Sequence, residues 1–117
     1  MNNLDKVSRP WGNYNILASE SFYKVKKIVV NPQSRISYQS HKFRNEIWVI
    51  VSGSGLITID ENKSKVNYGS VISIPKGSRH RIENNTQDKP LVFIEIQTGE
   101  AFEEEDITRY SDDYGRS

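Results

Sequence analysis

Short runs of β-branched and aromatic residues, separated by turn-forming residues, recur through the middle of this chain. Runs of this kind are typical of β-strands, and the Gly, Pro, Asn and Asp residues between them mark turns. The close spacing of strands and turns predicts an all-β antiparallel sandwich or barrel. The expected strands are residues 23–30, 46–51, 55–60, 70–74, 80–83 and 91–97.

The two ends of the chain lack this pattern. We expect the first dozen residues and the tail at 100–117 to be irregular segments around a core barrel at about 22–99. The acidic run at 103–106 either begins a short helix, because acidic side chains favour a helix N-terminus, or forms a solvated loop. A chain of 117 residues is expected to form one domain, residues 1–117, which buries about two thirds of its unfolded surface.

Composition excludes several classes of function. Sixteen basic and fifteen acidic residues give a net charge of +1 without a dense basic stripe, so nucleic acid is not an expected partner. No apolar run approaches the roughly 18–20 residues that span a membrane, and the first ten residues lack the apolar core of a secretory signal. We therefore expect a cytoplasmic protein. With no cysteine in the chain, any bound metal must have nitrogen and oxygen ligands.

A polar cluster lies just before the second expected strand. Gln39 and His41 are two positions apart, so on extended backbone they point to the same side, with Cα atoms about 6.5 Å apart. Glu46 is at the wrong parity to share that side on one uninterrupted strand. The polar residues 42–45 are therefore expected to form a hairpin or a bulge.

The strand that starts at Glu46 is apolar on both faces. Trp48 and Ile50 share the face of Glu46, while Ile47, Val49 and Val51 take the other. Such a strand is expected to be central in a closed barrel or to lie at a subunit contact, which favours a homodimer.

His80 follows a turn that contains Pro75 and Gly77, and this turn can reverse the chain. Taken singly, a histidine is more often a structural or surface residue, and a glutamate beside cationic residues is more often half of a surface ion pair. Taken together, two imidazoles, a carboxylate and an amide oxygen suit one divalent ion such as Zn, Mn, Co, Ni or Fe(II). The proposed ligands are Gln39, His41, Glu46 and His80.

The spacing of these residues resembles that of the cupin superfamily. Gln33, Gln39, His41, Glu46 and Gly53 lie at the positions of the first cupin motif, where Gln33 replaces the usual glycine and Gln39 the usual first histidine. The second motif is matched at each fixed position, by Gly69, Pro75, Gly77, His80 and Asn84. This resemblance implies a double-stranded β-helix, the jelly-roll barrel of cupins.

Within the cupins, the chain looks like the type II phosphomannose isomerase domain, the C-terminal part of bifunctional mannose-1-phosphate guanylyltransferase/mannose-6-phosphate isomerases. It departs from that family at Gln33, at Phe43 and at Ile47, the last two being positions where histidine is common. The segments that carry the resemblance are RPWGNY (9–14), YKVKKI (23–28), SYQSHKFRNEIW (37–48), IPKGSRHRIEN (74–84), IEIQTG (94–99) and EEDITRYSDDYGR (104–116).

The resemblance implies a metal-dependent isomerase that interconverts mannose 6-phosphate and fructose 6-phosphate, in a route to GDP-mannose and polysaccharide. Arg44 and Arg109 are the candidate catalytic residues, because a guanidinium matches a phosphate or an enediolate. Lys24, Lys26 and Glu95 are candidates for binding the substrate, with surface exposure as the alternative. Alternation alone does not decide whether Glu95 and Gln97 face the cavity or solvent, and Glu83, Asp106 and Asp113 are further possible bases.

A second interpretation is a non-catalytic metal cupin that binds a sugar or sugar phosphate. The 117 residues contain no glycine-rich nucleotide loop, so we expect any GDP-mannose synthesis to need another polypeptide. In this interpretation the domain assists a separate nucleotidyltransferase and keeps its metal as scaffold.

Overall fold

The computed structural model describes residues 6–116. Over this range the chain forms β-strands joined by turns and loops and contains no helix. The strands are Val7–Arg9 (β1), Gly12–Ser19 (β2), Tyr23–Val30 (β3), Ser34–Arg35 (β4), Tyr38–Ser40 (β5), Arg44–Ser52 (β6), Ser54–Ile59 (β7), Asn62–Asn67 (β8), Val71–Ile74 (β9), His80–Asn84 (β10), Leu91–Gly99 (β11) and Thr108–Ser111 (β12).

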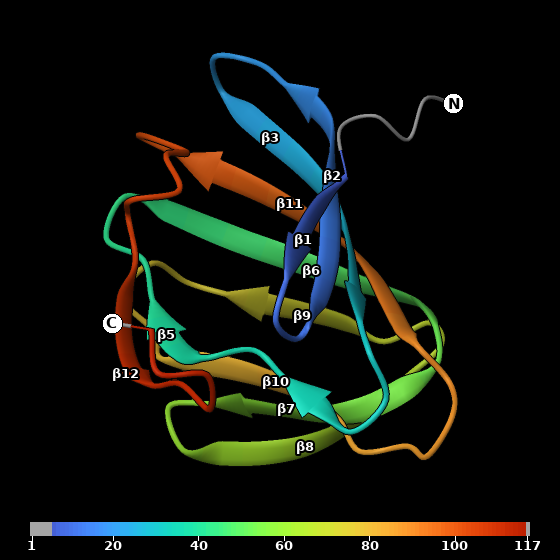
Figure 1. Cartoon of the computed structure of the whole chain (residues 1–117). Coiled ribbons are helices and arrows are strands. Elements are labelled where there is room, and N and C mark those ends of the chain that lie inside the picture. Colours follow the sequence, from blue (N-terminus) through green and yellow to red (C-terminus); the bar gives the residue numbers. More distant parts are fainter. Residues whose placement is uncertain (1–5, 117) are drawn as a thin grey trace.

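Two antiparallel sheets face each other and form the barrel (Figure 1). The larger sheet has the strand order β1-β2-β3-β11-β6-β9, and the smaller has the order β12-β5-β10-β7-β8, with β4 also paired to β10. Apolar side chains from both sheets, including Ile50, Phe93 and Ile82, form one continuous core. This confirms the predicted all-β class and the jelly-roll arrangement. No helix within residues 6–116 is long and apolar enough to cross a membrane.

The six predicted strands are all present, and each end lies within two residues of its expected position. The ends of the chain, however, are more regular than the sequence pattern indicated. Residues 12–19 form β2, which pairs with β3 along its length, and residues 108–111 form β12, which pairs with β5. These segments lack a clear strand pattern in the sequence, and pairing with neighbouring strands stabilises them as β-strands. The acidic run at 103–106 forms a turn rather than a helix.

The interior of the larger sheet changes from polar to apolar along its strands. On β6, Glu46, Trp48 and Ile50 are buried at 2%, 1% and 1% exposure, whereas Ile47 and Val51 on the opposite face are 37% and 41% exposed. In the single chain, then, β6 is buried on one face, and the subunit contact expected for the other face stays a prediction. Several buried polar residues lie at one end of the barrel and line a cavity there, and the apolar core fills the rest of the interior.

Gln33, the departure from the first cupin motif, lies between β3 and β4 with a φ of +56°. Residues with a Cβ are strained in this left-handed region, and glycine is not. The backbone therefore keeps the conformation that suits the usual glycine, although the side chain has changed.

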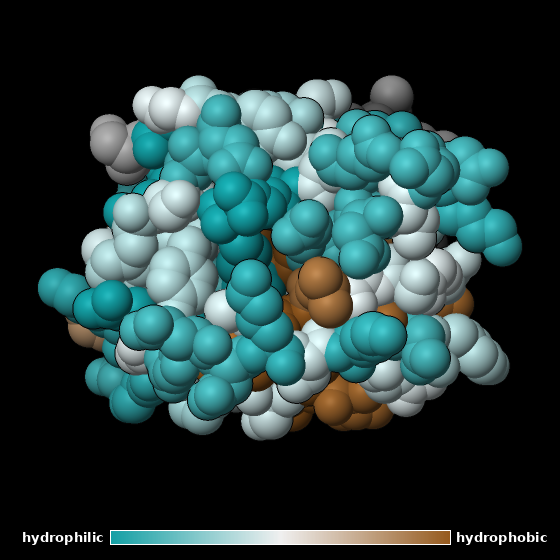
Figure 2. Space-filling model, turned by 90° about the horizontal axis from the view of Figure 1, so that it is seen from below, coloured by the Kyte–Doolittle hydropathy of each residue, from teal (hydrophilic) through white to brown (hydrophobic). Residues whose placement is uncertain are grey.

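Seen from below, where β7 and β8 form the lower edge, the surface is mostly hydrophilic, with only isolated hydrophobic residues (Figure 2). The outward side chains of β8 include Lys63 and Lys65, both exposed, which explains the polarity of this side. The candidate ligands His41, Glu46 and His80 lie inside the barrel instead.

Candidate metal centre and cavity

Three predicted ligands converge inside the polar end of the barrel. His41, Glu46 and His80 are each buried, and their ligand atoms all lie within 4.8 Å of one another. His41 Nε2 is 3.4 Å from Glu46 Oε2, and His80 Nε2 is 3.9 Å from Glu46 Oε1. The two imidazole rings lie 5.1 Å apart between centroids. The donors therefore surround a common point, as a cation site requires.

Backbone carbonyls fix the tautomers of both histidines. His41 Nδ1 lies 2.6 Å from the carbonyl oxygen of Asp106, and His80 Nδ1 lies 3.1 Å from that of Ser78. A carbonyl oxygen only accepts, so Nδ1 must donate in both rings. Each neutral ring then presents the Nε2 lone pair to Glu46, which is the orientation of a metal-binding imidazole.

The charge states of the triad also suit a cation. Burial lowers the pKa of His41 to about 4 and also lowers the pKa of His80. Burial alone raises the pKa of Glu46, but His80, His41 and Arg44 outweigh it and lower this pKa to about 2. At neutral pH the triad offers two neutral imidazoles and one carboxylate, all in their ligating forms.

Two neighbours already hold the Glu46 carboxylate. Arg44 Nε donates to Oε2 at 2.7 Å, and the Trp48 indole Nε1 donates to Oε1 at 2.9 Å. Arg44 Nη2 also lies 3.3 Å from His41 Nε2. By contrast, His80 Nε2 is buried and makes no hydrogen bond within residues 6–116. A divalent ion between these donors would satisfy that lone pair, so the residues present fit a metal.

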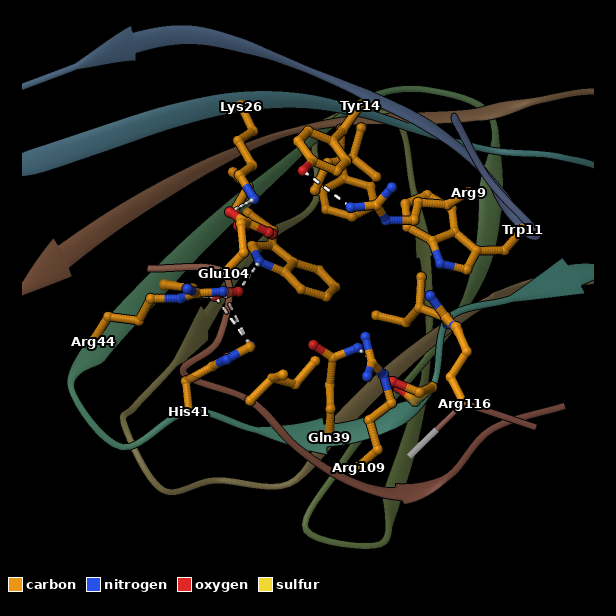
Figure 3. Close-up of a pocket in the computed structure, with 18 residues that line it drawn as sticks. Arg9, Trp11, Tyr14, Lys26, Gln39, His41, Arg44, Glu104, Arg109 and Arg116 are labelled. Carbon is orange, nitrogen blue, oxygen red and sulfur yellow. Dashed lines mark hydrogen bonds and ion pairs between the residues drawn. The ribbon is translucent and has the colours of Figure 1, made fainter. Parts of the chain in front are cut away.

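Gln39, the fourth predicted ligand, lines the same cavity. Its backbone pairs with His80 across β5 and β10, so the two side chains share one face of the smaller sheet. Its amide nitrogen donates to Ser37 Oγ at 2.9 Å, which leaves the side-chain oxygen on the side of His41 (Figure 3). Gln39 therefore lies where an amide ligand would be needed.

The segment between His41 and Glu46 is neither the predicted hairpin nor a bulge. It is a crossover, because β5 belongs to the smaller sheet and β6 to the larger. The carboxylate of Asp106 accepts hydrogen bonds from the backbone amides of Lys42 and Phe43, at 2.9 and 3.0 Å. Asp106, which the sequence indicated only as a possible base, therefore braces the loop that carries His41.

The cavity next to the triad has a volume of about 130 Å³. His41 and Arg44 lie on one side of it, and Arg9, Arg109 and Arg116 on the other (Figure 3). The two predicted catalytic arginines are therefore separated across the cavity. The sequence pattern did not single out Arg9 and Arg116, although both belong to the segments RPWGNY and EEDITRYSDDYGR that carried the family resemblance.

Lys26 and Glu95 also line the cavity, both buried. Lys26 Nζ is 2.5 Å from the carboxylate of Glu104, an acidic residue that the sequence placed in a solvated loop or a helix start. Lys24 lies beside this pair, with Nζ 3.5 Å from Glu104 and 3.2 Å from the carbonyl of Phe102, and does not line the cavity.

Glu95 faces the interior, which answers the question that strand alternation left open. Gln97 Nε2 donates to its Oε2 at 2.6 Å. Burial raises the pKa of Glu95 to about 8, and the Glu46 carboxylate adds to the rise. Glu95 therefore carries a proton at neutral pH.

The remaining candidate bases lie outside the cavity lining. Glu83 points outward from β10, and Asp113 forms an exposed ion pair with Arg35, at 2.7 Å. The family departures Phe43 and Ile47 are 46% and 37% exposed and also lie outside the lining, so the cavity does not depend on them.

The chain is similar to known proteins over nearly its whole length. Residues 1–112 match the family described as "Mannose-6-phosphate isomerase C-terminal". The mannose-1-phosphate guanylyltransferase of Escherichia coli K12 is 40% identical over 111 residues, which are 95% of this chain and 23% of that protein. The alginate biosynthesis protein AlgA of Pseudomonas syringae pv. tomato is 40% identical over 112 residues, 96% of this chain and 23% of that protein.

The chain thus spans about a quarter of the length of these curated relatives, 23% in each case. Among solved structures, the cupin domain of Schizosaccharomyces pombe Cnp3 superposes with a TM-score of 0.71 at 12% identity, covering 74% of this chain and 64% of that one. At this identity the likeness concerns the fold alone. The chain therefore has the cupin fold and belongs to the mannose-6-phosphate isomerase C-terminal family.

Proposed function

We propose that this domain is a metal-dependent isomerase that interconverts mannose 6-phosphate and fructose 6-phosphate. The observation that carries the proposal is that one cavity is lined by His41 and Glu46 of the buried triad, with His80 close behind them, and also by several cationic side chains. A sugar phosphate needs both kinds of group, since the isomerisation develops negative charge on the sugar and the substrate brings a charged phosphate. The family match and the names of the relatives support placing the reaction in the synthesis of polysaccharide precursors.

The triad and Gln39 would hold the ion, which we expect to be Zn, Mn, Co, Ni or Fe(II) because all its protein ligands are nitrogen or oxygen. When bound, a divalent ion supplies Lewis-acid charge beside the reacting oxygens of the sugar. Gln39 adds no charge to the ligand set, so the positive charge of the ion is less neutralised than it would be by a second carboxylate.

The protein's own residues supply the rest of the chemistry. Arg44 is fixed by Glu46 and keeps its guanidinium at the cavity wall, where it can stabilise charge on the sugar. The isomerisation moves a proton between C1 and C2, and Glu95 is a buried carboxyl in the lining with a pKa near neutrality. Gln97 engages Oε2 of Glu95, which leaves Oε1 to hold or release the proton.

The test is a coupled assay for fructose 6-phosphate formed from mannose 6-phosphate, with chelated protein and with each divalent ion added back. We expect no turnover after chelation and recovery with at least one ion. His80→Ala should remain inactive with every ion, whereas Arg79→Gln, a matched change at an exposed residue outside the cavity, should keep full activity. Full activity in metal-free protein would refute the proposal.

One observation favours a second candidate, a non-catalytic metal cupin that assists a separate guanylyltransferase. Both carboxylate oxygens of Glu46 already accept hydrogen bonds, from Arg44 and Trp48, so an ion would share them with these donors and would act with less of its Lewis-acid strength on a sugar. The relatives also contain about three quarters of their length beyond the matched region. Metal binding and sugar phosphate binding without turnover, under all ions, would identify this alternative.

A further inference from the structure

Three arginines from the two ends of the chain meet on the side of the cavity away from His41 (Figure 3). Arg9 ends β1, Arg109 lies in β12 and Arg116 follows β12. All three line the cavity and are half-buried. They are separate from the triad of His41, Glu46 and His80, so the cavity has two chemically different ends.

Hydrogen bonds and ion pairs within the protein hold the guanidinium groups of Arg9 and Arg116 in place. Arg9 donates to the Ser8 carbonyl at 3.0 Å and to the Tyr14 hydroxyl at 3.4 Å, and its guanidinium lies 5.3 Å from the centroid of the Tyr14 ring. Arg116 forms a two-pronged ion pair with Asp112, with both nitrogen to oxygen distances at 3.0 Å. Held groups of this kind lose little freedom when an anion binds.

Cationic groups predominate in this cluster among the residues that the structure describes. Among residues 6–116, the charged groups that act on Arg109 include two guanidinium groups, of Arg116 and Arg9, and the carboxylate of Asp112. Burial, followed by the charge of Arg116, lowers the pKa of Arg109, and Arg9 adds to the effect. Positive charges that lie close together at a cavity wall repel one another, and a bound anion relieves this repulsion.

The strand pairing sets the distance from this cluster to the metal centre. His80 pairs with Gln39 across β10 and β5, and Gln39 pairs with Arg109 across β5 and β12. Paired residues in an antiparallel sheet point to the same face, so all three side chains lie on the inner face of the smaller sheet, where Gln39 and Arg109 line the cavity. Two strand spacings separate the backbones of His80 and Arg109 by about 9–10 Å. A hexose 6-phosphate has a comparable length between its first carbon and its phosphorus.

We propose that Arg9, Arg109 and Arg116 form a phosphate-binding subsite that holds the 6-phosphate of the substrate, with the reacting end of the sugar directed at His41, Glu46 and His80. This inference rests on the proposed function for the identity of the sugar. A phosphate monoester carries a charge of about −1.5 to −2 at pH 7 and three acceptor oxygens, so it can use several guanidinium groups at once, more than a sugar carboxylate with its single charge. Arg109 is thereby a binding residue, distant from the reacting carbons.

The subsite can be tested without any metal or turnover. Inorganic phosphate, mannose 6-phosphate, mannose and glucuronate are titrated into chelated protein, with binding followed by calorimetry and by the phosphorus NMR shift. We expect both phosphates to bind and to compete with each other. Arg9→Gln and Arg109→Gln should each weaken phosphate binding at least about tenfold, the loss typical of one charge-assisted hydrogen-bonding group. Arg79→Gln should bind phosphate as the unaltered protein does.

Arg116 needs a paired change, because removing it alone leaves the buried carboxylate of Asp112, 2% exposed, without its cation. The double variant Arg116→Gln with Asp112→Asn keeps a hydrogen-bonding pair and should still lose affinity for phosphate. Equal binding of phosphate by the unaltered protein, Arg9→Gln and Arg109→Gln would overturn the subsite. Binding of glucuronate as tight as that of mannose 6-phosphate would overturn its assignment to phosphate.

The outcomes separate this inference from the proposed function. If the isomerase assay is silent with every ion and phosphate binding still depends on Arg9, the isomerase fails and the subsite stands. If the isomerase is active but Arg9→Gln changes neither phosphate binding nor the KM for mannose 6-phosphate, the subsite alone fails. If the isomerase function and the phosphate subsite are both correct, Arg9→Gln should raise KM by a larger factor than it lowers kcat.

Discussion

The imidazole of His41 donates through Nδ1 to the backbone carbonyl of Asp106, at 2.6 Å, and so ties the candidate metal centre to the C-terminal segment. The side chain of the same aspartate accepts from the amides of Lys42 and Phe43. One residue therefore sets both the orientation of the ring and the path of the loop that carries it. Outer interactions of this kind commonly tune metal affinity.

Removing these contacts should weaken metal binding. Asp106→Ala leaves two backbone amides without their acceptor, and the His41 loop loses its brace. We expect metal affinity to fall by about 10- to 100-fold, measured by titration of Co²⁺ or Zn²⁺ into chelated protein. Asp106→Asn retains one side-chain oxygen as an acceptor, so its loss should be smaller. Equal affinities for the alanine variant and the unaltered protein would show that the loop needs no brace.

Glu95 should make the stability of the metal-free protein depend on pH. The folded state keeps the Glu95 proton up to about pH 8, whereas an unfolded glutamate releases it near 4.5. The folded state thus binds more protons between these values, and the contribution of Glu95 to stability, complete below pH 4.5, is lost as pH rises to about 8.

The variant Glu95→Gln stays neutral and removes this dependence. Urea unfolding of both proteins at pH 5.5 and 8.5 isolates the effect, because the other titrating groups are common to the two. We expect the variant to gain stability relative to the unaltered protein as pH rises. A difference that does not change with pH would contradict the raised pKa of Glu95.

Gly12, within the RPWGNY segment, should be intolerant of any side chain. Its φ is +157°, and a Cβ at this position would lie 1.9 Å from the carbonyl oxygen of Val29 on the adjacent strand. Because that oxygen belongs to the backbone, β2 would have to move away from β3. We expect Gly12→Ala to lower the free energy of unfolding by about 2 kcal/mol or more.

The variant Gly69→Ala is a control that separates the effect of steric contact from that of backbone strain. Gly69 has a φ of +91°, and no atom lies within 4 Å of the place that a Cβ would take, so Gly69→Ala costs only the conformational term, about 1–2 kcal/mol. Chemical denaturation of both variants provides the comparison. A smaller loss for Gly12→Ala than for Gly69→Ala would mean that the close approach of the two strands is readily relieved.

The outer face of the larger sheet predicts a homodimer. Its outward side chains are mostly apolar, and Ile47, Val51 and Val71 are 37%, 41% and 66% exposed. A symmetric contact would bury this face on both copies. We expect sedimentation analysis to show a dimer, and Ile47→Glu to shift it toward the monomer. Thr58→Glu, a change that faces outward on the smaller sheet, should leave the dimer intact. A monomer in the unaltered protein would contradict this prediction.

Local sequence patterns predicted much of this protein because they depend on residues close along the chain. Alternating β-branched residues indicated six strands, and the spacing of Gln39 and His41 placed both on one side of the chain. The motif spacing around His80 indicated this residue as a further candidate ligand, and it lies beside His41 and Glu46. A strand's period is a local property, so these predictions needed no knowledge of the partner strands.

Strand order and register decided what the patterns left open. Whether Glu95 faced the cavity or solvent depended on which face of β11 met the smaller sheet. The polar strand β2 and the role of Asp106 depended on partners far away in sequence. Arg9 and Arg116 lie at opposite ends of the chain and meet because β1 and β12 border the same cavity. Contacts of this kind result from the closure of the whole barrel, which no single segment encodes.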